Sequence, residues 1–220
     1  MQSFYQQFRA PLLISILCIA IFQGAQAATP LSEGYRLYAP CSVCHQLSAW
    51  GSTDGSIPNL AGQRKQYLAK QLAEFKTAVR GNTAMQVVTF HRTVGNRHDL
   101  VALATYLSDL EPNPRPVEGL GDHLRVGQES FTHICAACHG PDGRGNRANT
   151  VPRIAGQHYP YLRRQIEMAA DLHRDFAPPE MTGALRGMPS QEKDALADYI
   201  SRLGNSDALL DSQRHDGVGK

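Results

Sequence analysis

The chain has 220 residues, of which 42% are hydrophobic and 19% are charged, and its formal net charge is +2. This is the composition of an ordinary globular protein, long enough for one large domain or two small ones. Neither sign of charge dominates, so the composition gives no support for a nucleic-acid partner.

Residues 1–27 have the pattern of a secretory signal peptide. Arg9 gives a positively charged start, residues 12–22 form an apolar run, and the small residues ending at Ala27 suit a cleavage site. The run is too short to span a bilayer comfortably, and an uncleaved anchor is the competing interpretation. Cys18 lies inside the run and would be discarded with it. We therefore expect an exported protein, located in the periplasm.

The remaining cysteines lie in two Cys-x-x-Cys-His motifs, which we call the clamps: Cys41, Cys44 and His45 in the first, and Cys135, Cys138 and His139 in the second. This motif attaches c-type haem: both thiols add to haem vinyl groups, and the histidine becomes the proximal iron ligand. A zinc ribbon would place its two cysteine pairs about 15–20 residues apart, whereas these pairs lie much further apart in the chain. A thioredoxin-like dithiol is expected beside a βαβ pattern, and the sequence contains no convincing strands. The motifs therefore predict two covalently bound haem c groups.

The clamps belong to a longer internal repeat with an offset of 94 residues. Residues 57–75 align with residues 151–169, and both segments contain Ala-Gly-Gln followed by Tyr-Leu. The closing segments 98–110 and 193–205 also resemble each other. Self-similarity on this scale indicates two homologous units. Between them, residues 111–119 contain three prolines, which stop a helix and favour a semi-rigid connector.

Each unit is predicted to be all-α, with a few short helices. Apolar residues recur at helical spacing in residues 66–78, 97–110 and 191–203, and further helices lead into the two clamps. We expect the following organisation: a first domain at 28–112, a linker at 113–119, a second domain at 120–205 and a polar tail at 206–220. Units of this size bury little apolar surface, so a covalently held haem would complete each core.

The sixth ligand of each iron remains to be assigned. A methionine thioether is typical of c-type electron carriers. In the first unit Met85 is the one methionine, and His91 is the competing ligand. In the second unit we favour Met181, which stands ahead of Tyr199 much as Met85 stands ahead of Tyr106, with Met188 as the alternative.

The clamps, the repeated Ala-Gly-Gln block, the methionines and the closing helices together resemble class I cytochromes c, over nearly all of residues 30–205. Two such domains in tandem resemble the cytochrome c4 family of periplasmic dihaem electron carriers. The resemblance implies that the carbonyls of Pro58 and Pro152 accept a hydrogen bond from the proximal histidines, which orients the rings and raises their basicity. It also implies iron ligation by Met181, and by Met85 despite three extra residues in the loop that follows it.

The resemblance further implies an electron carrier and not an enzyme. Its partners would be redox proteins: a donor at the level of quinol–cytochrome c reductase, and a terminal haem-copper oxidase or similar acceptor, with peripheral membrane association left open. The alternative is an electron-accepting subunit of a dehydrogenase complex, such as flavocytochrome c sulfide dehydrogenase. Dihaem peroxidase or thiosulfate dehydrogenase activity is not expected. Met85 and Met181 would close the open iron position that a peroxidase needs, and the clamps use every mature cysteine.

Other polar residues have simpler interpretations. His158 is expected at the surface or at a helix end, like the histidines outside the clamps in general. Arg64, Arg153, Tyr67 and Tyr161 either bond haem propionates or pack at the surface, two interpretations that the sequence leaves open.

Overall fold

The computed structural model describes residues 29–89, 94–146, 148, 150–171 and 177–204. The predicted signal peptide, His91 and the polar tail lie outside these residues. In the described part of the chain the regular structure is helical, and the one β-type pairing is an isolated bridge between Asn146 and Val151. The all-α fold class predicted from the sequence is therefore confirmed.

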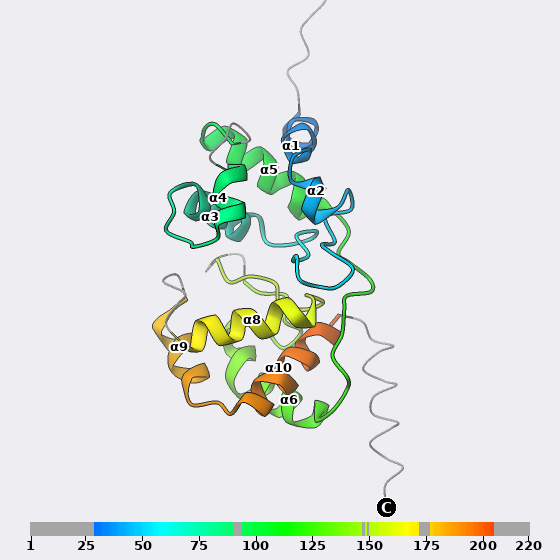
Figure 1. Ribbon diagram of the computed structural model, residues 1–220, viewed down its shortest axis with the longest axis vertical. Coiled ribbons are helices and arrows are strands. Elements are labelled where there is room, and N and C mark those ends of the chain that lie inside the picture. The colour runs from blue at the N-terminus through cyan, green and yellow to red at the C-terminus, as the bar shows by residue number, and fades with distance from the viewer. Residues whose placement is uncertain (1–28, 90–93, 147, 149, 172–176, 205–220) are drawn as a thin grey trace, which may run out of the picture.

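The helices of the first half are α1 (Pro30–Tyr38), α2 (Ser42–His45), α3 (Lys65–Lys76), α4 (Thr83–Val88) and α5 (Arg97–Asp109). Helices α1 and α3 both pack against α5, and Tyr38, Leu68 and Leu103 meet in their core. Helix α5 begins with a capping box, in which Asn96 accepts from the backbone of Asp99 and Asp99 accepts from the backbone of Asn96. The described residues of this half therefore form one core built around α5 (Figure 1).

The second half contains α6 (Leu124–Ser130), a π-helical turn η2 (Phe131–Cys135), α7 (Ala136–His139), α8 (Tyr159–Ala170), α9 (Pro179–Arg186) and α10 (Ser190–Arg202). Helices α6 and α8 pack against α10, as α1 and α3 pack against α5. Phe131, Leu162 and Leu196 lie in the resulting core. No helix in the described residues combines the length and the apolar character needed to cross a membrane.

Matching glycines allow the first and last helices of each half to cross closely. A Cβ on Gly34 of α1 would lie 2.4 Å from the carbonyl oxygen of Ala102 in α5. A Cβ on Gly127 of α6 would lie 2.1 Å from the carbonyl oxygen of Ala195 in α10. A side chain at either position would push the two helices apart, so the repeat preserves one crossing geometry in both halves.

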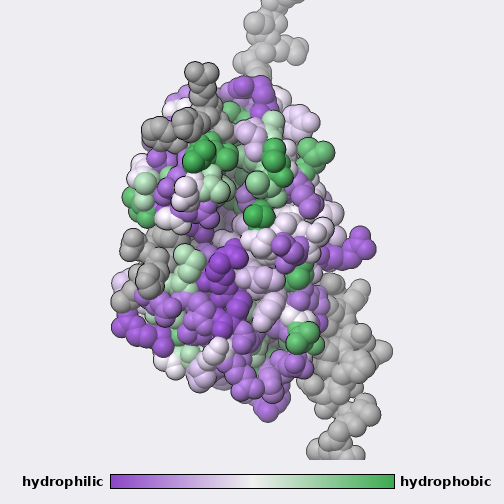
Figure 2. All heavy atoms as spheres, viewed as in Figure 1, coloured by the Kyte–Doolittle hydropathy of each residue, from purple (hydrophilic) through white to green (hydrophobic). Residues whose placement is uncertain are grey.

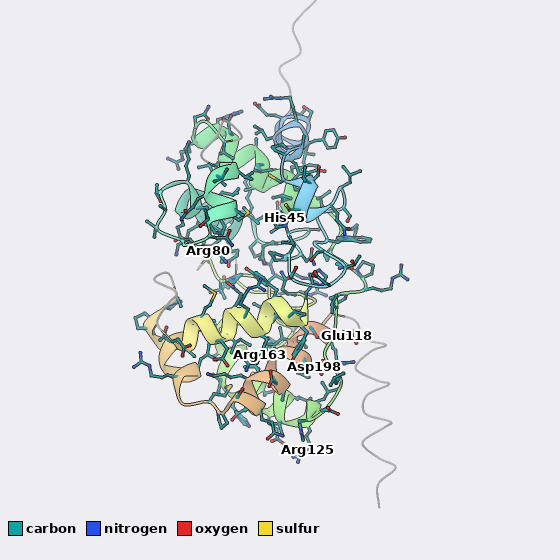
Figure 3. The ribbon with its side chains drawn as sticks, viewed as in Figure 1. His45, Arg80, Glu118, Arg125, Arg163 and Asp198 are labelled. Atoms are coloured by element: carbon teal, nitrogen blue, oxygen red, sulfur yellow. The ribbon has the colours of Figure 1, made fainter. Side chains whose placement is uncertain are left out.

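The connector between α5 and α6 runs along one side of the two stacked halves and is held against α10 (Figure 1). Asp198 accepts from the amides of Gly119 at 3.0 Å and Gly121 at 2.7 Å. Arg202 pairs with Asp198 and with Glu118, both at 2.8 Å. Figure 3 shows Glu118 and Asp198 side by side at the connector. The linker bounds at 113 and 119 stay predictions.

The residue after each clamp histidine has an unusual backbone conformation. Gln46 has φ 63° and ψ 166°, a region that is essentially restricted to glycine, and its side chain is exposed. Its counterpart in the second half is Gly140, with φ 79° and ψ 158°. The two halves therefore use the same turn, and only the first half has a side chain in it.

We expect Gln46→Gly to raise the free energy of unfolding by about 1 kcal/mol, because it removes this backbone strain. The reciprocal change Gly140→Gln should lower it by about 2 kcal/mol. Guanidinium unfolding of the two variants measures both effects. Equal changes of the same sign would show that the turn is not strained.

Asp198→Ala should lower the free energy of unfolding by about 3 kcal/mol, because two half-buried connector amides lose their buried acceptor and Arg202 loses one of two carboxylates. Arg125→Ala is the control, since it removes only the exposed pair between Arg125 and Glu129. That change should cost about 0.5 kcal/mol or less. Equal losses in the two variants would mean that Asp198 does not hold the connector.

Candidate haem sites

Each clamp lies on a single helical turn that runs from the core to the surface. The first cysteine of each motif, Cys41 or Cys135, is half-buried and packs against the core of its own half. The second, Cys44 or Cys138, is exposed. The helical turn fixes the spacing of the two thiols. The pair therefore suits attachment of a flat group that has one edge in the core and another edge at the surface.

The clamp histidines both contact a proline carbonyl. Nδ1 of His45 lies 3.0 Å from the carbonyl oxygen of Pro58, and Nδ1 of His139 lies 3.0 Å from that of Pro152. Because a carbonyl only accepts, each Nδ1 carries the proton, and Nε2 is the ring nitrogen with the lone pair that an iron would bind. Burial lowers the pKa of His45, partly opposed by its bond to Pro58, so its imidazole is kept in the neutral, metal-binding form.

The loop between each histidine and its proline is closed by the backbone. The amide of Gly51 donates to the carbonyl of His45 at 3.1 Å, and the amide of Gly145 donates to that of His139 at 2.7 Å. These bonds fold the chain back on itself, and Pro58 reaches the ring although it lies 13 residues after His45. The local fold thus fixes the orientation of the imidazole through hydrogen bonds within the protein itself.

The thiols do not have the properties of a redox dithiol. Burial, together with the neighbouring Cys44, raises the pKa of Cys41 to about 11. Burial and Cys138 likewise raise the pKa of Cys135 to about 11. A catalytic dithiol instead needs a lowered thiol pKa. The raised pKa values of Cys41 and Cys135 therefore argue against these two thiols as the nucleophiles of a redox dithiol.

A zinc site is also disfavoured. Among the residues that the structure describes, one group of His, Cys, Asp or Glu side chains is close enough to hold an ion: Glu33, His98 and Asp99. It contains no clamp residue. The two cysteine pairs therefore do not form a shared tetrahedral site within the described part of the chain.

The predicted methionine ligands occupy equivalent places in the two halves. Met85 is the third residue of α4, and Met181 is the third residue of α9. Met85 is held by Asn82, which accepts from its amide at 3.0 Å. Met181 is half-buried against the same core as Cys135, whereas Met188 is 7% exposed and lies inside that core. Cys135 and Met181 thus pack against one core, and the donor set of the second half, two thiols, an imidazole and a thioether, has the chemistry of a haem c site.

His158 was expected at the surface or at a helix end, and it is the N-cap residue of α8. It does not lie at the surface, because its side chain is 2% exposed and lies between the halves. Its Nε2 donates to the carbonyl of Trp50 at 2.6 Å, and its Nδ1 accepts from the amide of Val117 at 2.9 Å. His158 is buried by contacts with the other half and with the connector. The hydrophobic pattern of its own domain therefore could not predict this burial.

Arg80 is a residue of this boundary that the sequence analysis did not single out. It is 9% exposed, and Figure 3 places it at the boundary between the halves. From the first half it donates to the Tyr161 hydroxyl at 3.1 Å and to Gln165 Oε1 at 3.0 Å, both in α8, and to Gln71 of its own half. Gln71 and Gln165 occupy equivalent positions of the repeat, and both side-chain oxygens accept from Arg80. This recurrence was the sequence signal that could have pointed to a shared partner.

Three of the residues considered for haem propionates have other contacts. Tyr161 accepts from Arg80. Arg64 donates to the carbonyl of Arg144 at 2.7 Å, across the boundary, and Arg153 donates to that of Ala155 at 3.1 Å. The cations of this set therefore gather where the halves meet. Burial, followed by repulsion from Arg144 and then from Arg64, lowers the pKa of Arg153.

Comparisons with known proteins agree with this geometry. The sequence profile of the cytochrome c family matches residues 31–111 and 125–204. A thiosulfate dehydrogenase electron acceptor from Stutzerimonas stutzeri (strain A1501) is 29% identical over 217 residues, which cover 89% of this chain and 95% of the relative. A cytochrome c4 from Azotobacter vinelandii is 29% identical, over 70% of this chain and 79% of the relative.

A solved structure has a similar fold. The crystal structure of reduced cytochrome c4 from Pseudomonas stutzeri has a TM-score of 0.71 and 25% identity, covering 80% of this chain and 100% of that chain. With the two profile matches, this confirms the tandem domains and the two covalently bound haem c groups predicted from the sequence. The relationship also confirms an electron-transfer role with redox partners. The chain belongs to the cytochrome c family and is a dihaem carrier of the cytochrome c4 type.

Proposed function

We propose that this chain relays single electrons in the periplasm, between a respiratory donor and a terminal oxidase or similar acceptor. The observation that carries the proposal is the duplicated clamp, whose histidine is oriented at 3.0 Å by a proline carbonyl in both halves. The proposed residues of the first haem are Cys41, Cys44, His45, Pro58 and Met85, and those of the second are Cys135, Cys138, His139, Pro152 and Met181. The haem, when bound, supplies the one-electron chemistry.

The protein contributes rigid ligation and burial. His45 is 4% exposed and held at Nδ1, so its ring keeps one orientation whichever oxidation state the iron has. Met181 lies against a packed core, which restricts the movement of its side chain. With His139 and Met181 both binding the iron, the haem would carry one-electron chemistry and would have no open position for a substrate. This arrangement supports electron transfer over peroxidase chemistry.

A dehydrogenase is the favoured donor, with thiosulfate dehydrogenase as the first candidate. A relative covered over 95% of its length is named for accepting electrons from that enzyme. The quinol–cytochrome c reductase level is the second candidate, supported by the resemblance to cytochrome c4. In both cases the chain acts as the carrier, and the partner performs the oxidation of the substrate.

The donor is proposed to dock on the first domain, next to its clamp. Val43 and Leu47 flank the exposed Cys44, and they are 84% and 78% exposed. The corresponding residues of the second domain are the smaller Ala137 and Pro141. On the face shown in Figure 2, hydrophobic side chains gather over the half that contains α1 to α5. An apolar contact beside a haem edge brings a partner close without requiring a fixed pattern of charges.

Haem content and near-infrared spectra test the ligand assignment. The purified protein should contain two covalently bound haems and two methionine-to-iron charge-transfer contributions in the ferric state. Met85→Ala and Met181→Ala should each remove about half of that intensity, because each removes one of two thioether ligands. Met188→Ala is the control and should leave the intensity unchanged. A chain without covalent haem would overturn the proposed function, and a loss of intensity in the control would move the ligand to Met188.

Stopped-flow reduction of the ferric protein tests the donor and its docking site. Thiosulfate dehydrogenase with thiosulfate should reduce it faster than quinol–cytochrome c reductase with quinol. Val43→Asp should slow the second-order step on the order of tenfold, because it places a charge in an apolar contact. Ala137→Asp, at the matching position of the second domain, should have little effect. Equal slowing by the two variants would contradict docking on the first domain.

A further inference from the structure

The repeated Ala-Gly-Gln block supplies none of the proposed haem ligands, but its glutamines make hydrogen bonds across the boundary between the domains. Gln63 follows the first Ala-Gly pair, and Gln157 follows the second. The side chains are 9% and 8% exposed. Each turn is also fastened to the last helix of its own domain, since Gly62 donates to Leu107 and Gly156 donates to Ile200.

The two glutamines make the same contacts in opposite directions. Gln157 Oε1 accepts from the amide of Asn59 at 2.9 Å, and its Nε2 donates to the carbonyl of Asn59 at 2.8 Å. Gln63 Oε1 accepts from the amide of Arg153 at 2.8 Å, and its Nε2 donates to the carbonyl of Arg153 at 2.7 Å. Each carboxamide thus brackets the backbone of one residue in the other domain.

The bracketed residues directly follow the prolines that orient the haem-binding histidines. The amide of Asn59 and the carbonyl of Pro58 belong to the same peptide group, and that carbonyl contacts His45 Nδ1. One continuous path therefore runs from His45 through a single peptide group to the side chain of Gln157. The equivalent path runs from His139 through the peptide group of Pro152 and Arg153 to Gln63.

A peptide group transmits polarisation between its two ends. An acceptor at the amide hydrogen increases the electron density on the carbonyl oxygen and makes it a better acceptor. A stronger acceptor at Nδ1 makes the imidazole a more basic iron ligand. A more basic ligand favours ferric iron and lowers the reduction potential. Asn59 and both glutamines are buried, and Arg153 is half-buried, so competition from water for these bonds is limited.

We propose that Gln63 and Gln157 are positioning residues that tune the haem of the opposite domain, Gln157 acting on the haem at His45 and Gln63 on the haem at His139. This inference rests on the proposed function, since it takes the clamp histidines as iron ligands. The consequence is that each potential depends on the contact between the domains. A complex that shifts the domains apart would raise both potentials together, because both prolines would lose their polarising partner.

The test measures the potential of each haem in Gln157→Met and Gln63→Met. Methionine keeps the volume of the side chain and removes the acceptor. Redox titrations followed by NMR would use haem methyl signals assigned to each domain. We expect Gln157→Met to raise the potential of the first haem and Gln63→Met that of the second. The expected change in each reduction equilibrium constant is about threefold, or about 30 mV at 59 mV per tenfold change.

Two further variants complete the test. Gln157→Asn and Gln63→Asn keep a polar side chain but withdraw it by one methylene, and they should give the same crossed shifts if the methionine variants fold poorly. Gln165→Met removes a buried hydrogen bond from Arg80 across the same boundary but touches no proline peptide. It should leave both potentials unchanged.

The outcomes separate the inference from the function. Shifts on a glutamine's own haem, equal shifts on both haems, or the same shift in Gln165→Met would overturn the tuning role. If those samples still contain two covalent haems, the proposed function stands and only the inference fails. A chain that attaches no haem overturns both.

Discussion

The hydrogen bond from a histidine ring to a proline carbonyl is the contact on which the rest of this structure depends. It leaves Nε2 as the ring nitrogen available to the proposed haem iron, and it requires that a proline 13 residues further along returns to the clamp. The one-turn helices α2 and α7, the loop bonds at Gly51 and Gly145, and the packing of the following segment all serve that return. The proposed haem site of each domain is thereby built from a short stretch of chain around this one contact.

The boundary between the domains is polar, unlike the two cores. Glutamine side chains pair with backbone groups, and Arg80 donates to three side chains from both domains. Such bonds gain little net energy, because water would otherwise serve the same groups, but they are costly to leave unpaired once buried. They therefore fix the relative orientation of the domains more than they add to stability. For a relay, orientation is the property that matters, since it sets the path between the two irons.

Features that depend on a short segment, or that occur in both repeats, could be predicted from the sequence. The clamps are five-residue motifs, and the helical patterns recur in the two repeats, so the all-α fold and both haems could be predicted. His158 and Arg80 could not, because their burial is created by the opposite domain. Met85 and Met181 could be paired from the sequence only approximately, through their positions ahead of Tyr106 and Tyr199, because their numbers differ by 96 and not by 94. The structure adds that each is the third residue of its helix, α4 or α9.

The reciprocal glutamine contacts have the form of an isologous interface, in which the same patch of two copies pairs with itself, as in a twofold-symmetric dimer. Here the two copies are joined by the connector between Asp109 and Leu124. A short tether gives each copy an effective concentration in the millimolar range for the other. The interface can then remain small and hydrophilic, where two separate chains would need a broad apolar patch to stay together. Because the two domains are covalently linked, the surfaces beside the haems do not have to form an apolar dimer interface.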